Sequence, residues 1–169
     1  FTALNNSFSK DPKSTRSISW QTDTLYSEPT IELIRLGEDF TKENIKEYKG
    51  DSFKNTKILT KKNTNKVLID NLEAGVTYQY RLKNMIANDP TKIAYLSNTF
   101  NFTTEAKTIN EFTFLHLADS QGSSNSYAKY WSNTLGQALN KYPDTPFIIQ
   151  TGDMVDSPNE SHFTNYFNA

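Results

Sequence analysis

Two short apolar runs in the last third of the chain, each followed by an acidic segment, constrain the fold more than any other feature. The first run, 112–118, ends at Asp119, and the second, 146–150, leads through Gly152 to Asp153. A polar stretch with apolar residues at spacings of three and four lies between them and predicts a helix. This order is typical of a β-α-β unit, here with a carboxylate after each of its two parallel strands. In open α/β sheets, ligands bind at such strand ends.

The predicted helix carries a single apolar stripe, which we expect to be buried against one face of a parallel sheet. Pro143 ends this helix, and a second helix is expected from Pro158, with Phe163, Tyr166 and Phe167 directed inward. The stripe consists of Tyr127, Tyr130, Trp131, Leu135, Ala138, Leu139 and Tyr142.

The first hundred residues follow a different pattern, in which short segments of alternating polar and apolar residues are separated by turn signals. Such a rhythm predicts an antiparallel β-sandwich. Ile18 and Trp20 are expected to face its core, as are Ile31 and Leu33. The expected strands are 17–22, 30–36, 66–70, 77–82 and 97–103, and Tyr48 and Phe53 mark strand points within the charged stretch 40–56.

Composition excludes several classes of function. The chain has 18 basic and 19 acidic residues, so no strongly positive surface is expected and no nucleic-acid partner is indicated. It has no Cys, which excludes thiolate catalysis and Cys-ligated zinc. No apolar run is long enough to span a membrane. The chain begins at Phe1 without Met, and we expect a secreted product, extracellular or in the cell envelope, whose signal peptide has been removed.

The carboxylates that follow the two apolar runs are the candidate chemical groups. Asp119 and Asp153 should point into one crevice, where they would repel each other unless one is protonated or a cation lies between them. Carboxylate oxygens suit hard or borderline metal ions. Gln121 can offer a carbonyl oxygen to the same ion, and Gly152 allows a sharp turn after the strand. The alternative is that both carboxylates are simply solvated loop side chains.

Other catalytic motifs are missing from the sequence. It has no Gly-x-x-x-x-Gly-Lys-Ser/Thr loop, no Gly-x-Gly-x-x-Gly and no Gly-x-Ser-x-Gly. A haloacid-dehalogenase-like nucleophile would need Asp at the position of Gln121. We expect His116 to have a packing or supporting role and His162 to be exposed. No residue is assigned as catalytic.

The first hundred residues resemble a fibronectin type III sandwich. The resemblance lies in three segments: 17–22 (SISWQT) is similar to its second strand, 72–78 (LEAGVTY) to its tyrosine corner, and 100–104 (FNFTT) to its last strand. In a tyrosine corner the Tyr hydroxyl bonds to nearby backbone. The resemblance therefore implies such a bond for Tyr78.

The rest of the chain resembles the calcineurin-like metallophosphoesterases, whose first two motifs are similar to 117–121 (LADSQ) and 151–156 (TGDMVD). A fibronectin-like domain before such a catalytic domain is the arrangement of purple acid phosphatases and their bacterial relatives. The resemblance implies a multi-domain fold, in which an all-β immunoglobulin/fibronectin-like sandwich spans 1–106. Residues 107–169 would form the first βαβ unit of an α/β metallophosphoesterase sandwich.

Site roles follow from the same resemblance. Asp119 would bind the first metal, Asp153 would bridge two metals, and Gln121 stands where the family often has a His ligand. Asp156 would support the loop by hydrogen bonds. It stands where purple acid phosphatases have a metal-binding Tyr, so no purple iron-tyrosinate centre is expected. The implied cofactors are two divalent or trivalent ions, with Fe, Zn or Mn preferred.

The implied activity is hydrolysis of phosphate esters, monoester or diester, by the full-length protein. The family's later Asn-His motif and further His ligands do not occur in these 169 residues, so the piece alone is expected to be inactive. The remaining C-terminal part of the catalytic domain is expected either as a separate chain after a break or as a part that was removed. Two alternatives stay open: a non-catalytic extracellular binding module that uses the β-sandwich, and a phosphate sensor that binds metal without turnover.

Overall fold

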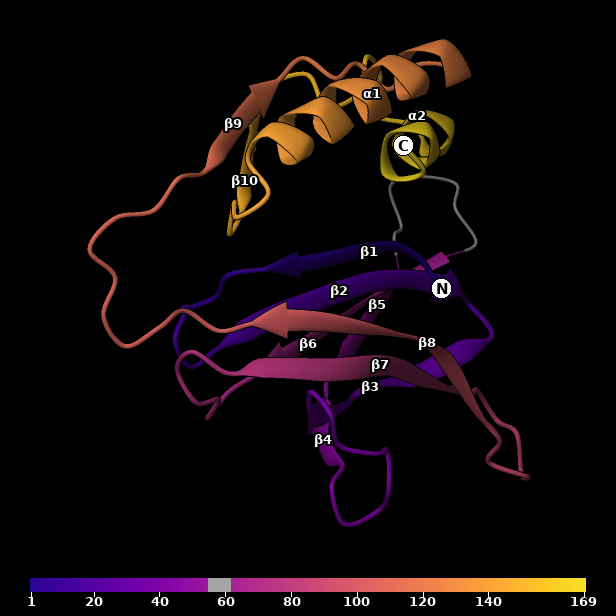
Figure 1. The fold of residues 1–169 in the computed structure, drawn as a ribbon. Helices are drawn as coiled ribbons and strands as arrows, with labels where there is room; N and C mark the ends of the chain where they lie inside the picture. The colour runs from indigo at the N-terminus through magenta and orange to yellow at the C-terminus, as the bar shows by residue number, and fades with distance from the viewer. Residues whose placement is uncertain (55–61) are drawn as a thin grey trace. The chain divides into compact units, whose positions relative to one another are not determined.

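The computed structural model describes residues 1–54 and 62–169, and the chain divides into two compact units, Phe1–Thr108 and Ile109–Ala169 (Figure 1). Residues 55 and 56 of the expected strand-bearing stretch 40–56 lie outside the described residues.

The first unit is a β-sandwich, as the alternating pattern predicts. Within the described residues it has two four-stranded sheets with antiparallel pairing, ordered β1-β2-β6-β5 and β4-β3-β7-β8. The strands are β1 (Thr2–Ser7), β2 (Arg16–Asp23), β3 (Tyr26–Arg35), β4 (Lys46–Lys49), β5 (Asp51–Lys54), β6 (Lys62–Ile69), β7 (Thr77–Ile86) and β8 (Ala94–Thr103).

The core of this unit consists of alternate residues from the facing strands. Successive side chains of a strand point to opposite faces of a sheet, so every second residue reaches the space between the sheets. The indole Nε1 of Trp20 donates a hydrogen bond of 2.9 Å to Oδ1 of the buried Asn84, which satisfies the one polar atom that this ring brings into the core. The buried apolar residues include Ile18, Trp20, Ile31, Leu33, Val67, Ile69, Tyr80 and Leu82.

A tyrosine corner closes the turn before β7, as the resemblance implies. The backbone N–H of Glu73 donates a hydrogen bond of 2.9 Å to the hydroxyl oxygen of Tyr78, whose ring is 7% exposed. This bond connects the start of β7 to the preceding turn. Because the ring is part of the core, the same residue anchors both the turn and the sandwich.

A charged cluster covers the outer face of the β4-β3-β7-β8 sheet. Glu32 of β3 is only 6% exposed, and it accepts hydrogen bonds from Arg81 Nε at 2.7 Å and Lys83 Nζ at 2.9 Å. Lys83 also bonds to Glu47 at 2.6 Å, and Phe40 packs over the Arg81 guanidinium. Burial raises the pKa of Glu32, but the bonds from Lys83 and Arg81 outweigh it and hold the pKa below its ordinary value.

The second unit contains β9 (Leu115–Ala118), α1 (Asn125–Lys141), β10 (Ile148–Thr151) and α2 (Glu160–Phe167). The two strands pair in parallel, and the register places Ile148 beside Leu115 and Thr151 beside Ala118. Both strands therefore end at the same level. Among the described residues, no helix is long and apolar enough to cross a lipid bilayer.

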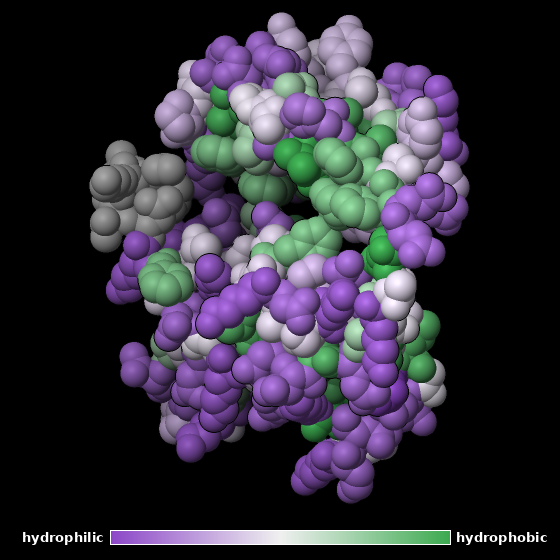
Figure 2. Space-filling model, turned by 90° about the vertical axis from the view of Figure 1, so that its left-hand side faces the viewer, coloured by the Kyte–Doolittle hydropathy of each residue, from purple (hydrophilic) through white to green (hydrophobic). Residues whose placement is uncertain are grey.

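The expectation that the α1 stripe is buried is wrong for most of its members. Trp131 is the buried residue of this helix, and its ring stacks on Tyr166 of α2 at a centroid distance of 5.7 Å. Tyr130 is 70% exposed, and Phe167 of α2, which was expected to point inward, is 40% exposed. The reason is geometric, because a sheet of two strands is too narrow to cover a helix of this length. Figure 2 shows apolar side chains on the surface of this unit.

Tyr78→Phe tests the tyrosine corner. Removing the hydroxyl leaves the N–H of Glu73 without this partner, and we expect the free energy of unfolding to fall by about 1 kcal/mol. Urea denaturation followed by tryptophan fluorescence measures the change. Tyr95→Phe is the control, because this ring is 41% exposed and has no hydrogen bond through its hydroxyl to any described residue. Equal stability of the Tyr78 variant and the wild type would refute the role of this bond.

The ion pairs of Glu32 predict a pH dependence of stability. A carboxylate with a lowered folded-state pKa stabilises the fold above its ordinary value of 4.5, and this contribution is lost as the pH falls through the folded-state pKa. We expect Glu32→Gln to cost about 1.5–3 kcal/mol at pH 7, since it removes charge-assisted hydrogen bonds.

The variant should also lose less stability than the wild type between pH 7 and pH 3, as measured by urea denaturation at both values. Glu43→Gln, at an exposed residue, is the matched control. A parallel loss of stability in the wild type and the Glu32 variant would contradict the assignment.

Candidate metal site

The acidic segments that follow β9 and β10 lie side by side and are connected by backbone hydrogen bonds. The N–H of Asp119 donates to the carbonyl of Gly152 at 3.3 Å, and the N–H of Gln121 donates to the carbonyl of Asp153 at 2.8 Å. A third bond, of 3.1 Å, runs from the N–H of Gly122 to the carbonyl of Met154. The pairing of the two strands thus continues into the loops. The structure brings together the segments that contain the sequence-predicted residues.

These loops contain strained backbone. Asp119, Gln121 and Asp153 have φ values of 57°, 43° and 40°, in the left-handed region. This conformation costs a non-glycine residue about 1–2 kcal/mol. Gly152, at 68°, adopts the same region without that cost. Residues held in sparsely populated conformations cluster at ligand-binding and active sites. Three such residues in two adjoining loops mark this end of the sheet as a candidate site.

The carboxylates of the site are free to bind a ligand. Asp119 and Asp153 are exposed, and their side chains form no hydrogen bond or ion pair with any residue that the structure describes. A cation bound between the two loops would take oxygen donors from both carboxylates. Oxygen donors of this kind, with the amide of Gln121, fit a hard or borderline metal ion.

The donor set in this chain is nevertheless incomplete. Among residues 1–54 and 62–169, no group of three or more His, Asp or Glu side chains is placed to hold a metal ion. The residues present therefore fit part of a metal site, with two carboxylates and one amide oxygen. Further ligands would have to come from outside the described residues.

The loop after Asp153 is held by a histidine that the sequence did not single out for this role. The N–H of Ser157 donates to Nδ1 of His162 at 3.2 Å, and the N–H of His162 in turn donates to Oδ1 of Asn159, which caps α2. His162 is half-buried, so the expectation that it is exposed is wrong. Asp156 is exposed and forms no hydrogen bond with any described residue. Among these residues, the loop is therefore supported by the contact between Ser157 and His162 and not by the expected bonds from Asp156.

His116 occupies the middle of β9 and forms a bond across the strand pair. Its Nε2 lies 2.7 Å from the hydroxyl oxygen of Thr151, the last residue of β10. The bond helps to align the two strand ends, a supporting role of the kind expected for this residue.

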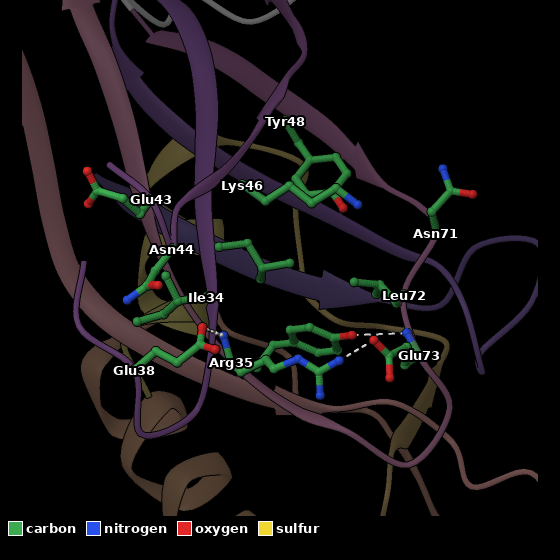
Figure 3. A pocket seen from close by; sticks show the side chains of 12 residues that line it. Ile34, Arg35, Glu38, Glu43, Asn44, Lys46, Tyr48, Asn71, Leu72 and Glu73 are labelled. Atoms are coloured by element: carbon green, nitrogen blue, oxygen red, sulfur yellow. Dashed lines mark hydrogen bonds and ion pairs between the residues drawn. The ribbon is translucent and has the colours of Figure 1, made fainter. Parts of the chain in front are cut away.

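The sandwich has a separate pocket of about 290 Å³, shown in Figure 3. Leu33 and Leu72 are among the residues that line it. Lys46 and Tyr48 lie on one side of it, with Lys46 Nζ 5.0 Å from the centroid of the Tyr48 ring. An ion pair between Arg35 and Glu73 lies along the opposite side of the pocket. No sequence motif pointed to this pocket, because its walls come from four separate segments.

Gly122→Ala tests how α2 is packed on the first acidic loop. An added Cβ would lie 3.0 Å from Cβ of Tyr166 and 3.1 Å from the carbonyl oxygen of His162, so the helix would have to move. We expect faster amide hydrogen exchange in α2. Gly136→Ala is the control, because nothing lies within 4 Å of the added atom and alanine stabilises a helix by about 1 kcal/mol relative to glycine. Unchanged exchange in α2 of the Gly122 variant would contradict the packing.

Comparison with known proteins identifies the sandwich. Residues 2–104 match the family model described as the N-terminal domain of purple acid phosphatase. A comparison with characterised protein sequences gives no match.

Solved structures show similar folds at low sequence identity. A purple acid phosphatase from seeds of yellow lupin (Lupinus luteus) has a TM-score of 0.58 and 10% identity, over 88% of this chain and 34% of the lupin chain. This chain thus spans about a third of the length of the lupin enzyme.

Two weaker likenesses have TM-scores below the level at which a shared fold can be argued. Astrotactin-2, a vertebrate perforin-like membrane protein, has a TM-score of 0.45 and 14% identity, over 83% of this chain and 25% of its own. A computationally redesigned β-sandwich has a TM-score of 0.40 and 15% identity, over 62% of this chain and 94% of its own.

The family match covers more than half of the chain, and the chain belongs to the family of purple acid phosphatase N-terminal domains.

Proposed function

We propose that this chain is part of a metal-dependent phosphoric ester hydrolase, in which residues 107–169 begin a calcineurin-like catalytic domain. Its family membership places the sandwich among domains of phosphatases. The observation that carries the proposal is the 2.8 Å hydrogen bond from the N–H of Gln121 to the carbonyl of Asp153, because it brings the two acidic loops together.

The proposed site uses the free carboxylates at the strand ends. Asp119 would hold one metal ion and Asp153 would bridge it to a second, while Gln121 would add a neutral oxygen donor. Two bound ions, with Fe, Zn or Mn preferred, would supply a hydroxide nucleophile at neutral pH and charge stabilisation for the phosphoryl oxygens. The left-handed backbone at the three residues would fix the direction of their side chains before an ion binds.

The proposal also includes a larger catalytic domain than these residues contain. Parallel sheets are normally covered on both faces, whereas β9 and β10 pair only with each other in the described residues. Ile148 and Ile149 of β10 are 39% and 40% exposed, and Phe112 before β9 is 59% exposed. Further strands and helices, either later in the protein or on a separate chain, would cover this apolar surface and supply the remaining ligands. We also propose that the full-length protein acts outside the cytoplasm.

The second candidate is a non-catalytic binding module, and the pocket beside Tyr48 in the sandwich favours it. In that case the sandwich would hold a ligand or polymer, and the acidic loops would have no role in turnover. Loss of metal and of activity in a single carboxylate variant would discriminate between the two functions.

Asp153→Asn is that variant. In the full-length protein, we expect hydrolysis of p-nitrophenyl phosphate to fall at least about 100-fold, because residues that merely support metal ligands already change affinity or activity 10–100-fold. The bound metal, measured by inductively coupled plasma mass spectrometry, should fall as well. Asp144→Asn makes the same charge change at an exposed residue of the same unit and should leave both readouts unchanged. A wild-type protein that binds no metal and does not hydrolyse p-nitrophenyl phosphate would instead support the binding module, and a fully active Asp153 variant would contradict the proposed role of this carboxylate.

A further inference from the structure

We propose that Ser120 and Gln150 are positioning residues that hold the Asp119 loop against the Asp153 loop, so that both carboxylates can reach one cation. This inference rests on the proposed function, since it concerns the same site. Neither residue would bind the ion. Each would act through the backbone of the loops.

Ser120 connects the two loops through its side chain. It lies between Asp119 and Gln121, is only 6% exposed, and its hydroxyl donates a hydrogen bond of 3.0 Å to the carbonyl of Met154 in the second loop. The N–H of Gly122 donates to the same carbonyl at 3.1 Å. Met154 directly follows Asp153, so this carbonyl is a fixed point one residue from the proposed bridging carboxylate.

Gln150 supports this connection from β10. Its Nε2 donates to the hydroxyl oxygen of Ser120 at 3.3 Å and lies 3.4 Å from the carbonyl of Gly152. Because the amide occupies an acceptor position of the hydroxyl, the hydroxyl proton is directed to Met154. The Oε1 atom of Gln150 is buried without a hydrogen-bond partner in the part of the chain that the structure describes. Leaving this oxygen unpaired costs free energy. The two contacts of Nε2, with Ser120 and Gly152, must therefore hold the Gln150 amide in this orientation.

The loops need such a connection because the left-handed backbone at Asp119, Gln121 and Asp153 is unfavourable on its own. Backbone bonds alone fix the loops at three points. The buried Ser120 and the half-buried Gln150 add side-chain bonds that oppose separation of the loops, which keeps the donors in place for the ion.

The test measures binding of Mn²⁺ to the full-length protein by isothermal titration calorimetry, independently of turnover. We expect Ser120→Ala to weaken Mn²⁺ binding about tenfold, within the range known for residues that orient metal ligands. Ser120→Thr keeps the hydroxyl and should restore most of the affinity. Ser126→Ala is the matched control, because this serine is exposed on α1 and bonds through its side chain to no described residue.

Amide hydrogen exchange gives a readout that does not depend on metal. The N–H groups of Gln121 and Gly122 bond across the loops, so they should exchange faster in metal-free Ser120→Ala than in the wild type, while α1 remains unchanged. Gln150→Met removes the amide at similar volume and serves as a second variant if Ser120→Ala does not fold. It should change exchange and Mn²⁺ affinity in the same direction.

The outcomes distinguish the positioning role of Ser120 and Gln150 from the proposed metal-dependent function. Weaker Mn²⁺ binding with faster exchange in Ser120→Ala, and recovery in Ser120→Thr, supports the positioning role. Wild-type binding that is undiminished in both Ser120→Ala and Gln150→Met overturns that role and leaves the proposed function standing. A wild-type protein that binds no Mn²⁺ overturns both.

Discussion

The candidate site depends on the hydrogen bonds that join the loops after β9 and β10. Parallel pairing ends the two strands level with each other, and the bond from Gln121 to Asp153 extends that pairing into the acidic segments. A change of register would carry one carboxylate along the strand direction, away from the other. The short strand pair is therefore the scaffold of the candidate site, and the strained backbone of the loops persists because the surrounding bonds over-determine it.

The sandwich was predictable from sequence because both of its sheets are present and bury each other. Alternation alone located Ile18 and Trp20 in the core, where they are 0% and 1% exposed. The turn before Tyr78 was recognisable for a similar reason, since the spacing of its residues determines which backbone group the hydroxyl can reach. The α1 stripe failed as a predictor of burial because periodicity shows which side chains share a face. It does not show whether a surface is there to cover them, and Tyr130 remains exposed.

At the site, sequence reasoning could find the carboxylates but not the residues that hold them. Asp119 and Asp153 follow apolar strands, and that position is visible in the chain itself. Ser120 and Gln150 are ordinary polar residues whose roles depend on a contact between segments that the fold brings together. His162 is similar, because its bond to Ser157 requires the loop to fold back on α2. Left-handed φ values at Asp or Gln could not be predicted from the sequence either, because Gly is the residue type that predicts such a conformation.

The most direct test of the central claim is to locate a metal ion by anomalous X-ray scattering from crystals of the full-length protein grown with Mn²⁺. The account predicts an anomalous peak about 2.0–2.2 Å from carboxylate oxygens of both Asp119 and Asp153, the distance typical of such ligands. A map with no peak at these two residues, or with an ion bound elsewhere while both carboxylates remain in solvent, would contradict it.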